Sequence, residues 1–315
     1  MYIIKCTQGD KQLLNPVHNF LKELKPHDLP GGKRIRLGLK KDGGYVLFNK
    51  GLENIDVLYS YGVETNSDFE LMFCEKYNSI ARLYDHTVDT IPIKKDFLYF
   101  KKEGVGPVKT KNLNTIENHI NENEDSNKKL ILKIDTEGAE WDTFHEMSNE
   151  ILGSFEQIVM EIHGLHSEHP DYNGINLFKS KIERKTQVIN KINKLFYLYH
   201  VHANNYEPLF YTGRFKLPNT MELTYVNKKY FKNIEYSKTI FPTKFDAPNY
   251  SKREDINLHF WPFYPGVMSH IKLIITQNSW YEGWKKILDL ISRHFESKWK
   301  SIIIAMKLRR PTSYS

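Results

Sequence analysis

The stretch Leu130–Phe144, LILKIDTEGAEWDTF, joins an apolar run to a cluster of acids. The run is apolar almost throughout, which is typical of a strand covered on both faces of a sheet. It ends at Asp135, and Glu137, Glu140 and Asp142 follow at once. Glu140 and Asp142 fall in the first turn of an expected helix, where acids suit the positive end of the helix dipole. Asp135 and Glu137 need another explanation, because an unpaired buried charge is costly.

Strand and helix signals alternate on both sides of this stretch. Apolar or aromatic runs predict strands at 55–63, 79–85, 96–106, 129–135 and 155–164, and helical signals predict helices at 67–77, 112–125 and 140–152. This alternation indicates an α/β fold of βαβ units with a mostly parallel sheet. Further along, we expect a long helix over 178–196 and two strands, 197–205 and 221–228, paired antiparallel at the sheet edge.

The two ends of the chain complete the predicted organisation. Residues 1–54 contain a short helix and an alternating hairpin around a Lys-Asp-Gly-Gly turn, and we interpret them as an N-terminal cap. Residues 55–235 form the expected α/β domain. Residues 236–315 are irregular and then helical over roughly 278–306, so we treat them as a C-terminal appendage, a lid or an interaction region.

Composition limits the class of protein. The chain has 315 residues, of which 40% are hydrophobic and 26% charged, and this suits a sizeable core. Two cysteines, Cys6 and Cys74, indicate neither a disulfide framework nor a cysteine zinc site. With no signal-peptide pattern and no apolar run near the roughly 20 residues of a membrane span, we expect a soluble, cytoplasmic protein. The net charge of +7 is spread out, so we expect no nucleic-acid partner.

Acids and glycines occur at the expected carboxyl ends of the strands, where ligands bind in open α/β sheets. These strand-end residues are Gly62, Asp85, Gly104, Asp135, Glu161 and His163. A nicotinamide enzyme would show G-x-G-x-x-G after the first strand, but this chain has G-V-E-T-N-S there and no phosphate-binding loop. A cofactor with ribose and adenine but no phosphate fits better. Asp85 would accept hydrogen bonds from the ribose hydroxyls, and this favours S-adenosylmethionine.

Five segments resemble successive motifs of the FkbM-like methyltransferases, including a related methyltransferase-like group. They are DGGYVLF at 42–48, LYSYGVETNSDFE, RLYDHT, LKIDTEGAEWDTF and VMEIHGL, and the resemblance covers roughly residues 34–205. The most specific piece is K-I-D-T-E-G-A-E-W, which is similar to the family pattern K-I-D-x-E-G-x-E. The resemblance implies a Rossmann-like class I methyltransferase, with a seven-stranded, mostly parallel sheet, helices on both faces, and S-adenosylmethionine as cofactor.

The resemblance also implies roles for individual residues. Gly62 and Glu64 would lie against the methionine portion of the cofactor, and Asp85 would hold the ribose. Gly104 and Val105 would flank the adenine, and Asp135 would lie beside the sulfonium. The full implied set of cofactor-binding residues is Tyr61, Gly62, Glu64, Asn66, Asp85, His86, Gly104, Val105, Asp135 and Glu137.

An oxygen acceptor with a high pKa needs a base or a metal to remove its proton. Glu161 and His163 lie two apart on one expected strand, so both face the same side. His163 is then a general base, or Asp135, Glu161 and His163 hold a divalent metal. A third interpretation is structural, with Glu161 paired to a lysine. A second polar cluster, which we assign to the acceptor, contains His202, Asn204 and Asn205. The alternative is that the histidine is only a hydrogen-bonded residue at a strand end.

The leading hypothesis is therefore an S-adenosylmethionine-dependent O-methyltransferase acting on a sugar or glycan hydroxyl. Two alternatives stay open: a methyltransferase with a protein or other small-molecule acceptor, and an inactive methyltransferase fold that serves as a binding module. The basic helix expected near the C-terminus, SKWKSIIIAMKLRRP, also suggests peripheral contact with a membrane surface.

Overall fold

The structure, a computed structural model, describes residues 3–6, 10–165, 174–207, 209–212, 215–264, 287, 288 and 292. The chain divides into two compact units, Met1–Phe263 and Tyr264–Ser315, and the fold described below is that of the first. The helix expected over 278–306 lies almost wholly outside the described residues, and the basic segment proposed to contact a membrane lies entirely outside them.

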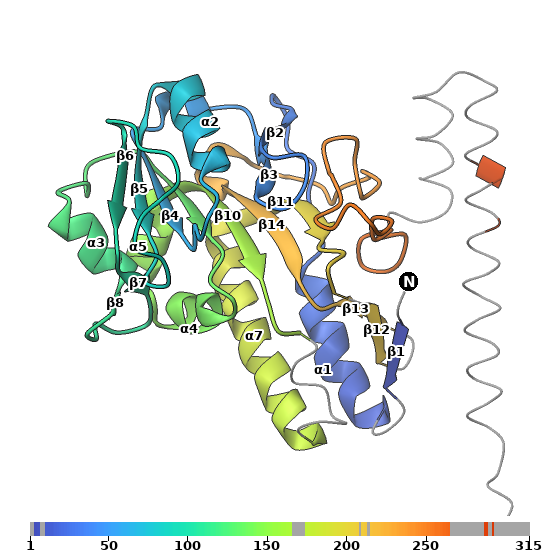
Figure 1. The fold of residues 1–315 in the computed structure, drawn as a ribbon. Coiled ribbons are helices and arrows are strands. Elements are labelled where there is room, and N and C mark those ends of the chain that lie inside the picture. The colour runs from blue at the N-terminus through green and yellow to red at the C-terminus, as the bar shows by residue number, and fades with distance from the viewer. Residues whose placement is uncertain are drawn as a thin grey trace, which may run out of the picture. The chain divides into compact units, whose positions relative to one another are not determined.

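A seven-stranded sheet forms the centre of the first unit, with the strand order β11-β14-β10-β9-β4-β5-β6 (Figure 1). Its strands are β4 (Val57–Tyr61), β5 (Ile80–Tyr84), β6 (Leu98–Lys101), β9 (Leu130–Ile134), β10 (Phe155–Ile162), β11 (Phe196–Ala203) and β14 (Met221–Asn227). The sheet is mixed, because β14 pairs antiparallel with both neighbours while the other four pairings are parallel. The predicted α/β fold is confirmed, and the sheet is consistent with a Rossmann-like architecture.

The predicted antiparallel pairing of the last two strands at the sheet edge is confirmed. Of the two, β11 is the edge strand, and β14 inserts between β10 and β11. This insertion places Glu222 of β14 directly opposite Glu161 of β10.

Helices cover both faces of the sheet. They are α1 (Asp10–Glu23), α2 (Asp68–Tyr77), α3 (Ile116–Glu122), α4 (Ala139–Glu146), α5 (Asn149–Ser154) and α7 (Ile175–Leu195). One core joins α1, α3, α4, α5 and α7 to alternate strand residues such as Tyr59 and Leu132, and a second joins α2 to the opposite face through Leu58 and Ile131. This alternation follows from the two-residue period of a strand. The side chains of Thr115 and Ser148 cap the N-termini of α3 and α5.

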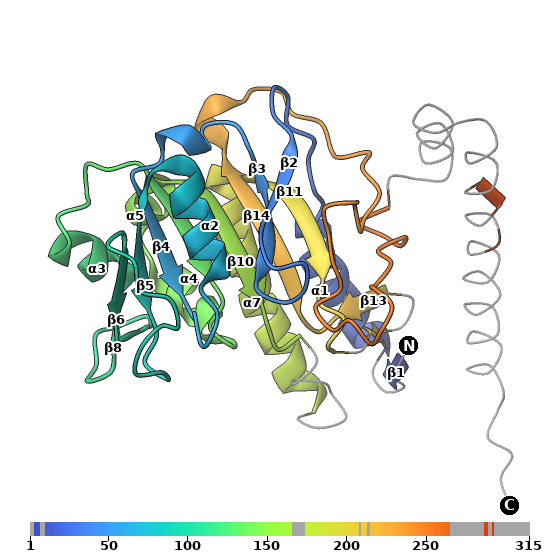
Figure 2. The ribbon, with the colours of Figure 1, turned by 45° about the horizontal axis from the view of Figure 1, so that its top comes forward.

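A hairpin of β2 (Arg34–Gly38) and β3 (Gly44–Phe48) lies on the same face as α2 (Figure 2). Hydrogen bonds hold it to the sheet: Gln157 Nε2 donates to the Phe48 carbonyl at 2.7 Å, and Thr224 Oγ1 donates to the Val46 carbonyl at 2.5 Å. The hairpin predicted in the N-terminal cap is therefore confirmed. Its docking brings the Lys-Asp-Gly-Gly turn toward the carboxyl ends of the central strands.

Smaller elements complete the first unit. A three-stranded sheet contains β1 (Ile3–Cys6), β12 (Leu209–Thr212) and β13 (Phe215–Pro218), and a two-stranded one contains β7 (Gly104–Val105) and β8 (Leu113–Asn114). Two short 3-10 helices span Leu52–Asn54 and Lys228–Tyr230.

The segment after β14 belongs to the first unit as far as Phe263, whereas the sequence analysis begins the appendage at residue 236. Its backbone and side chains bond to earlier parts of the chain. Ser237 N–H donates to the Pro26 carbonyl at 2.8 Å, and Asn205 Oδ1 accepts from the Tyr250 N–H at 2.7 Å. These long-range contacts explain why an irregular stretch packs as part of the main unit.

Candidate functional site

The carboxyl ends of β4, β5, β9 and β10 form one edge of the sheet. β4 lies between β5 and β9, so the order of the strands reverses there, and ligands favour such a point in α/β sheets. Gly62 follows β4 with a φ of 75°, and a Cβ at this position would lie 1.6 Å from the Asp135 carbonyl oxygen. Only glycine permits this approach, so two residues predicted from the sequence are confirmed as neighbours.

Asp85 follows β5, is buried, and accepts four hydrogen bonds from neighbouring turns of the chain. Oδ2 accepts from the N–H groups of Val63 at 3.1 Å and Glu64 at 2.9 Å. Oδ1 accepts from the N–H and Oγ1 of Thr87 at 2.8 and 2.6 Å. Burial alone would raise the pKa of Asp85, but these bonds lower it below its ordinary value. Asp85 therefore fixes the turn after β4.

The other residues predicted to hold the cofactor lie around this turn. Glu64 is exposed with a φ of 43°, and its pKa is raised by partial burial and by the charges of Asp135 and Glu137. The Asn66 amide lies close to the hairpin, 2.2 Å from where a Cβ on Gly43 would be. This places the turn after β4 directly beside the Lys-Asp-Gly-Gly turn.

A second pair of predicted cofactor residues meets beside β7. The His86 ring covers Gly104, since its Nδ1 would lie 2.4 Å from a Cβ there. Val105 is buried in the core on the α3 side of the sheet, and so is Tyr61. The Tyr61 hydroxyl bonds to His119 at 3.1 Å, so this side chain points into the core rather than toward the sheet edge.

Asp135, Glu161 and His163 form the group expected to act on the acceptor. Their potential ligand atoms lie within 4.8 Å of one another. His163 Nε2 is 3.6 Å from Asp135 Oδ1 and 3.8 Å from Glu161 Oε1. The predicted constellation is therefore assembled at the ends of β9 and β10.

Glu140 positions His163, although the sequence analysis assigns it only to the helix dipole. Its Oε1 accepts from the His163 N–H at 2.8 Å and lies 3.3 Å from the His163 Nδ1. Burial alone would lower the pKa of His163, but the bond to Glu140 and the charges of Glu161 and Asp135 raise it to about 9. At neutral pH the ring is therefore the imidazolium cation, in which both nitrogens donate.

Glu161 is buried among other acids. Burial raises its pKa well above the ordinary value, and so do the charges of Asp135 and Glu222. Its one hydrogen bond within the described part of the chain comes from Asn204 Nδ2 at 2.7 Å. In the described part of the chain, the ion-pair partner of Glu161 is His163 and not a lysine.

Tyr45, Asp42 and Glu222 belong to the site, and the sequence analysis did not select them. The Tyr45 hydroxyl donates to Asp135 Oδ2 at 2.9 Å. Asp42 and Glu222 form a second acidic group with Glu161, again with ligand atoms within 4.8 Å. The D-G-G-Y-V turn was a usable signal for Asp42 and Tyr45. Glu222 could be found only from strand register.

The residues assigned to the acceptor bind other parts of the protein. His202 lies between two carboxylates, with Nδ1 3.1 Å from Glu222 and Nε2 3.0 Å from Asp255. Asn204 holds Glu161, and Asn205 Nδ2 donates to backbone carbonyls at 250–254. His202 and Asn205 thus anchor the segment that follows β14, while Asn204 adjoins the acidic group.

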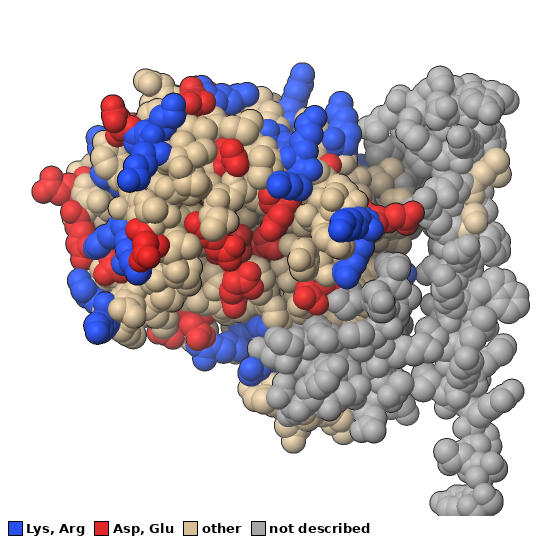
Figure 3. All heavy atoms as spheres, in the orientation of Figure 1, with Lys and Arg blue, Asp and Glu red and all other residues tan. Residues whose placement is uncertain are grey.

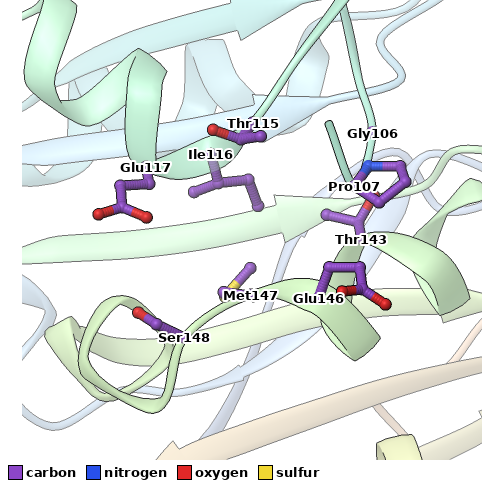
Figure 4. Close-up of a pocket in the computed structure, with 9 residues that line it drawn as sticks. All are labelled: Gly106, Pro107, Thr115, Ile116, Glu117, Thr143, Glu146, Met147 and Ser148. Atoms are coloured by element: carbon purple, nitrogen blue, oxygen red, sulfur yellow. The ribbon is translucent and has the colours of Figure 1, made fainter. Parts of the chain in front are cut away.

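Acidic side chains gather near the middle of one face of the molecule, whereas basic ones lie mainly toward its periphery (Figure 3). A cavity of about 90 Å³ lies elsewhere, between α3 and α4 (Figure 4). It is lined by Gly106, Pro107, Thr115, Ile116, Glu117, Thr143, Glu146, Met147 and Ser148, which include none of the predicted site residues.

No family model and no curated protein matches the chain. The resemblance to FkbM-like methyltransferases therefore stays a prediction. Among the residues that the structure describes, none of the helices is both long and apolar enough to span a membrane.

Proposed function

We propose that the protein is an S-adenosylmethionine-dependent methyltransferase whose acceptor is a sugar or glycan hydroxyl. One observation supports this above the others: Gly62, Asp85 and Asp135 meet where the strand order reverses, as the family motifs predict. The seven-stranded sheet also agrees with the class I methyltransferase sheet that the resemblance implies.

The carboxylates at this edge suit a cofactor that carries a positive charge and hydroxyl groups. Glu64 and Glu137 are exposed, and Asp135 is partly exposed. Their mutual repulsion contributes to the raised pKa of Glu64, which shows a negative field at the edge. Such a field stabilises a sulfonium, and carboxylate oxygens accept hydrogen bonds from ribose hydroxyls. When bound, S-adenosylmethionine supplies an electrophilic methyl group.

Removal of the acceptor's proton is assigned to the group of Asp135, Glu161 and His163. Because His163 holds a proton at neutral pH, it acts as a base only after releasing that proton. The rate of methyl transfer would then rise with pH toward about 9. A divalent cation on the same three residues is the other route, since it would replace the imidazole proton and lower the hydroxyl pKa.

Calorimetric titration with S-adenosylhomocysteine tests the proposal. We expect micromolar binding by the wild type and at least about tenfold weaker binding by Glu64→Ala, because one charged hydrogen bond contributes about 1.5–3 kcal/mol. Glu53→Ala, an exposed acid in the 3-10 helix before β4, is the matched control and should bind normally. Absence of binding to folded wild type would contradict the proposal.

A catalytically inactive binding module is the second candidate, and one observation favours it. The Asp85 carboxylate already accepts four hydrogen bonds from its own chain, so a ribose must share or displace them. Methyl transfer from labelled S-adenosylmethionine to a panel of saccharides separates the two candidates. Failure to bind S-adenosylhomocysteine, or binding with no transfer to saccharides, proteins or other small acceptors, would favour the module.

A further inference from the structure

Two glutamates face each other across a buried strand pair. The antiparallel register of β10 and β14 pairs Glu161 with Glu222, and the two residues are only 3% and 5% exposed. Like charges directly opposite each other destabilise a sheet, and burial makes an uncompensated charge more costly. This arrangement calls for a positive charge between the two carboxylates.

A third acid arrives from a distant part of the chain. Asp42, in the turn of the β2–β3 hairpin, offers a carboxylate oxygen within 4.8 Å of those of Glu161 and Glu222. Oxygens bound to one Ca²⁺ at about 2.3–2.6 Å lie at most about 5 Å apart, so the spacing fits a single cation. A ligand set of carboxylate oxygens selects Ca²⁺, Mg²⁺ or Mn²⁺ over softer metals.

Asn249 provides an independent indication of a ligand. It is 6% exposed, and its amide points at the group: Nδ2 donates to Asp42 Oδ1 at 3.1 Å and to Glu222 Oε1 at 2.7 Å. Its Oδ1 is buried and accepts no hydrogen bond from any residue that the structure describes. A half turn of the amide would exchange the two atoms, give up both hydrogen bonds and direct this unsatisfied oxygen at a cation held by the acids.

The neighbouring cationic side chains are shared with further acids. His202 contacts Glu222, but its other ring nitrogen bonds to Asp255. His163 is 3.8 Å from Glu161, but it also faces Asp135, Glu137 and Glu140. Carboxylates therefore outnumber cationic groups around the β10–β14 pair in the described part of the chain.

We propose that Asp42, Glu161 and Glu222 bind one divalent cation that prefers oxygen ligands, with the Asn249 side-chain oxygen as a fourth ligand. The cation would fasten the turn of the β2–β3 hairpin to the central sheet. This site differs from the group of Asp135, Glu161 and His163, with which it shares only Glu161. The inference does not depend on methyl transfer.

Calorimetric titration of the full chain with MnCl₂, CaCl₂ and MgCl₂, after treatment with EDTA, tests the site. We expect at least one of these cations to bind the wild type with one-to-one stoichiometry. Asp42→Asn should weaken binding at least about tenfold, since even residues that only support a ligand change affinity 10–100-fold. Asp42 is exposed on a turn, so the variant should fold, and a melting curve in EDTA checks this.

Two variants make the result specific. Glu53→Gln removes an exposed acid that belongs to neither group of potential ligands and should bind like the wild type. Asp135→Asn should change affinity less than about threefold. If binding is lost with Asp135→Asn and kept with Asp42→Asn, or if no cation binds the wild type, the proposal is wrong. Titration with S-adenosylhomocysteine in EDTA reports separately on the proposed function.

Discussion

Asp85 and Glu161 are both buried carboxylates near the carboxyl ends of strands in the same sheet, yet their surroundings are opposite. Asp85 accepts four hydrogen bonds, and these lower its pKa. Glu161 accepts one hydrogen bond within the described chain, faces other acids, and has a raised pKa. The first environment favours the charged form and the second disfavours it.

This difference separates two uses of a buried acid. A carboxylate that its own chain saturates stabilises a turn and has little capacity left for a ligand. A carboxylate that its own chain leaves unsatisfied lowers stability, and such groups concentrate at functional sites. The Asp85 carboxylate is therefore mainly architecture, whereas the acids near β10 and β14 keep capacity for a ligand.

The largest effect is expected from Gly62→Ala, which disrupts the turn after β4. The new Cβ would overlap the Asp135 carbonyl oxygen at 1.6 Å, and the backbone there has a φ of 75°. We expect a loss of at least about 4 kcal/mol in the free energy of unfolding, or no folding at all. Gly51→Ala is the control, because its φ is 86° but its Cβ would meet nothing within 4 Å. It should cost only about 1–2 kcal/mol in chemical denaturation.

His202→Gln should have the next largest effect. Burial alone would lower the pKa of His202, but the charge of Glu222 and the bond to Asp255 raise it well above its ordinary value. Its contribution is complete below the unfolded pKa of about 6.5 and is lost as pH rises through the folded pKa. We expect a loss of about 3 kcal/mol at pH 6, shrinking at alkaline pH in urea titrations. If the loss of unfolding free energy in His202→Gln does not depend on pH, His202 is not an imidazolium in the folded protein.

Asp85→Asn tests the saturated carboxylate. The folded pKa is lowered, so the stability from Asp85 is present above the unfolded pKa of about 3.9 and is lost as pH falls through the folded value. We expect the variant to lose about 2 kcal/mol at pH 7, because the amide nitrogen cannot accept two of the four hydrogen bonds and the other two lose their charge. Urea titrations at pH 7 and below pH 3 should show the two proteins converging in acid.

The smallest effect, and one of opposite sign, is expected from Glu161→Gln. The raised pKa of Glu161 means that its charge opposes folding above its unfolded pKa of about 4.3. Gln removes that charge and keeps the oxygen that accepts from Asn204. We expect unchanged stability or a gain of up to about 1 kcal/mol at pH 7, together with loss of cation binding. If Glu161→Gln loses as much unfolding free energy as Asp85→Asn, the proposed difference between the two acids is wrong.

Local sequence patterns predicted the strands that end at the site, and with them Gly62, Asp135 and His163. They could do so because strand periodicity and strand ends are properties of neighbouring residues. Glu222 was missed because its position opposite Glu161 depends on how β14 inserts into the sheet. The positive charge of His163 was missed for a similar reason, since it depends on Glu140 of α4, 23 positions earlier in the chain. Asn205 was assigned to an acceptor because nothing local shows the segment that it binds.

Asn249 and Asp42 are 207 positions apart in the chain, and their hydrogen bond has a consequence for the order of synthesis. At about 5–20 residues per second, the ribosome needs roughly 10–40 s to add the residues that separate them. During that interval the β2–β3 hairpin can form, but the acidic group lacks its amide. Cation binding would therefore mark a chain that has been made and folded through residue 249, well after the nascent sheet first appears.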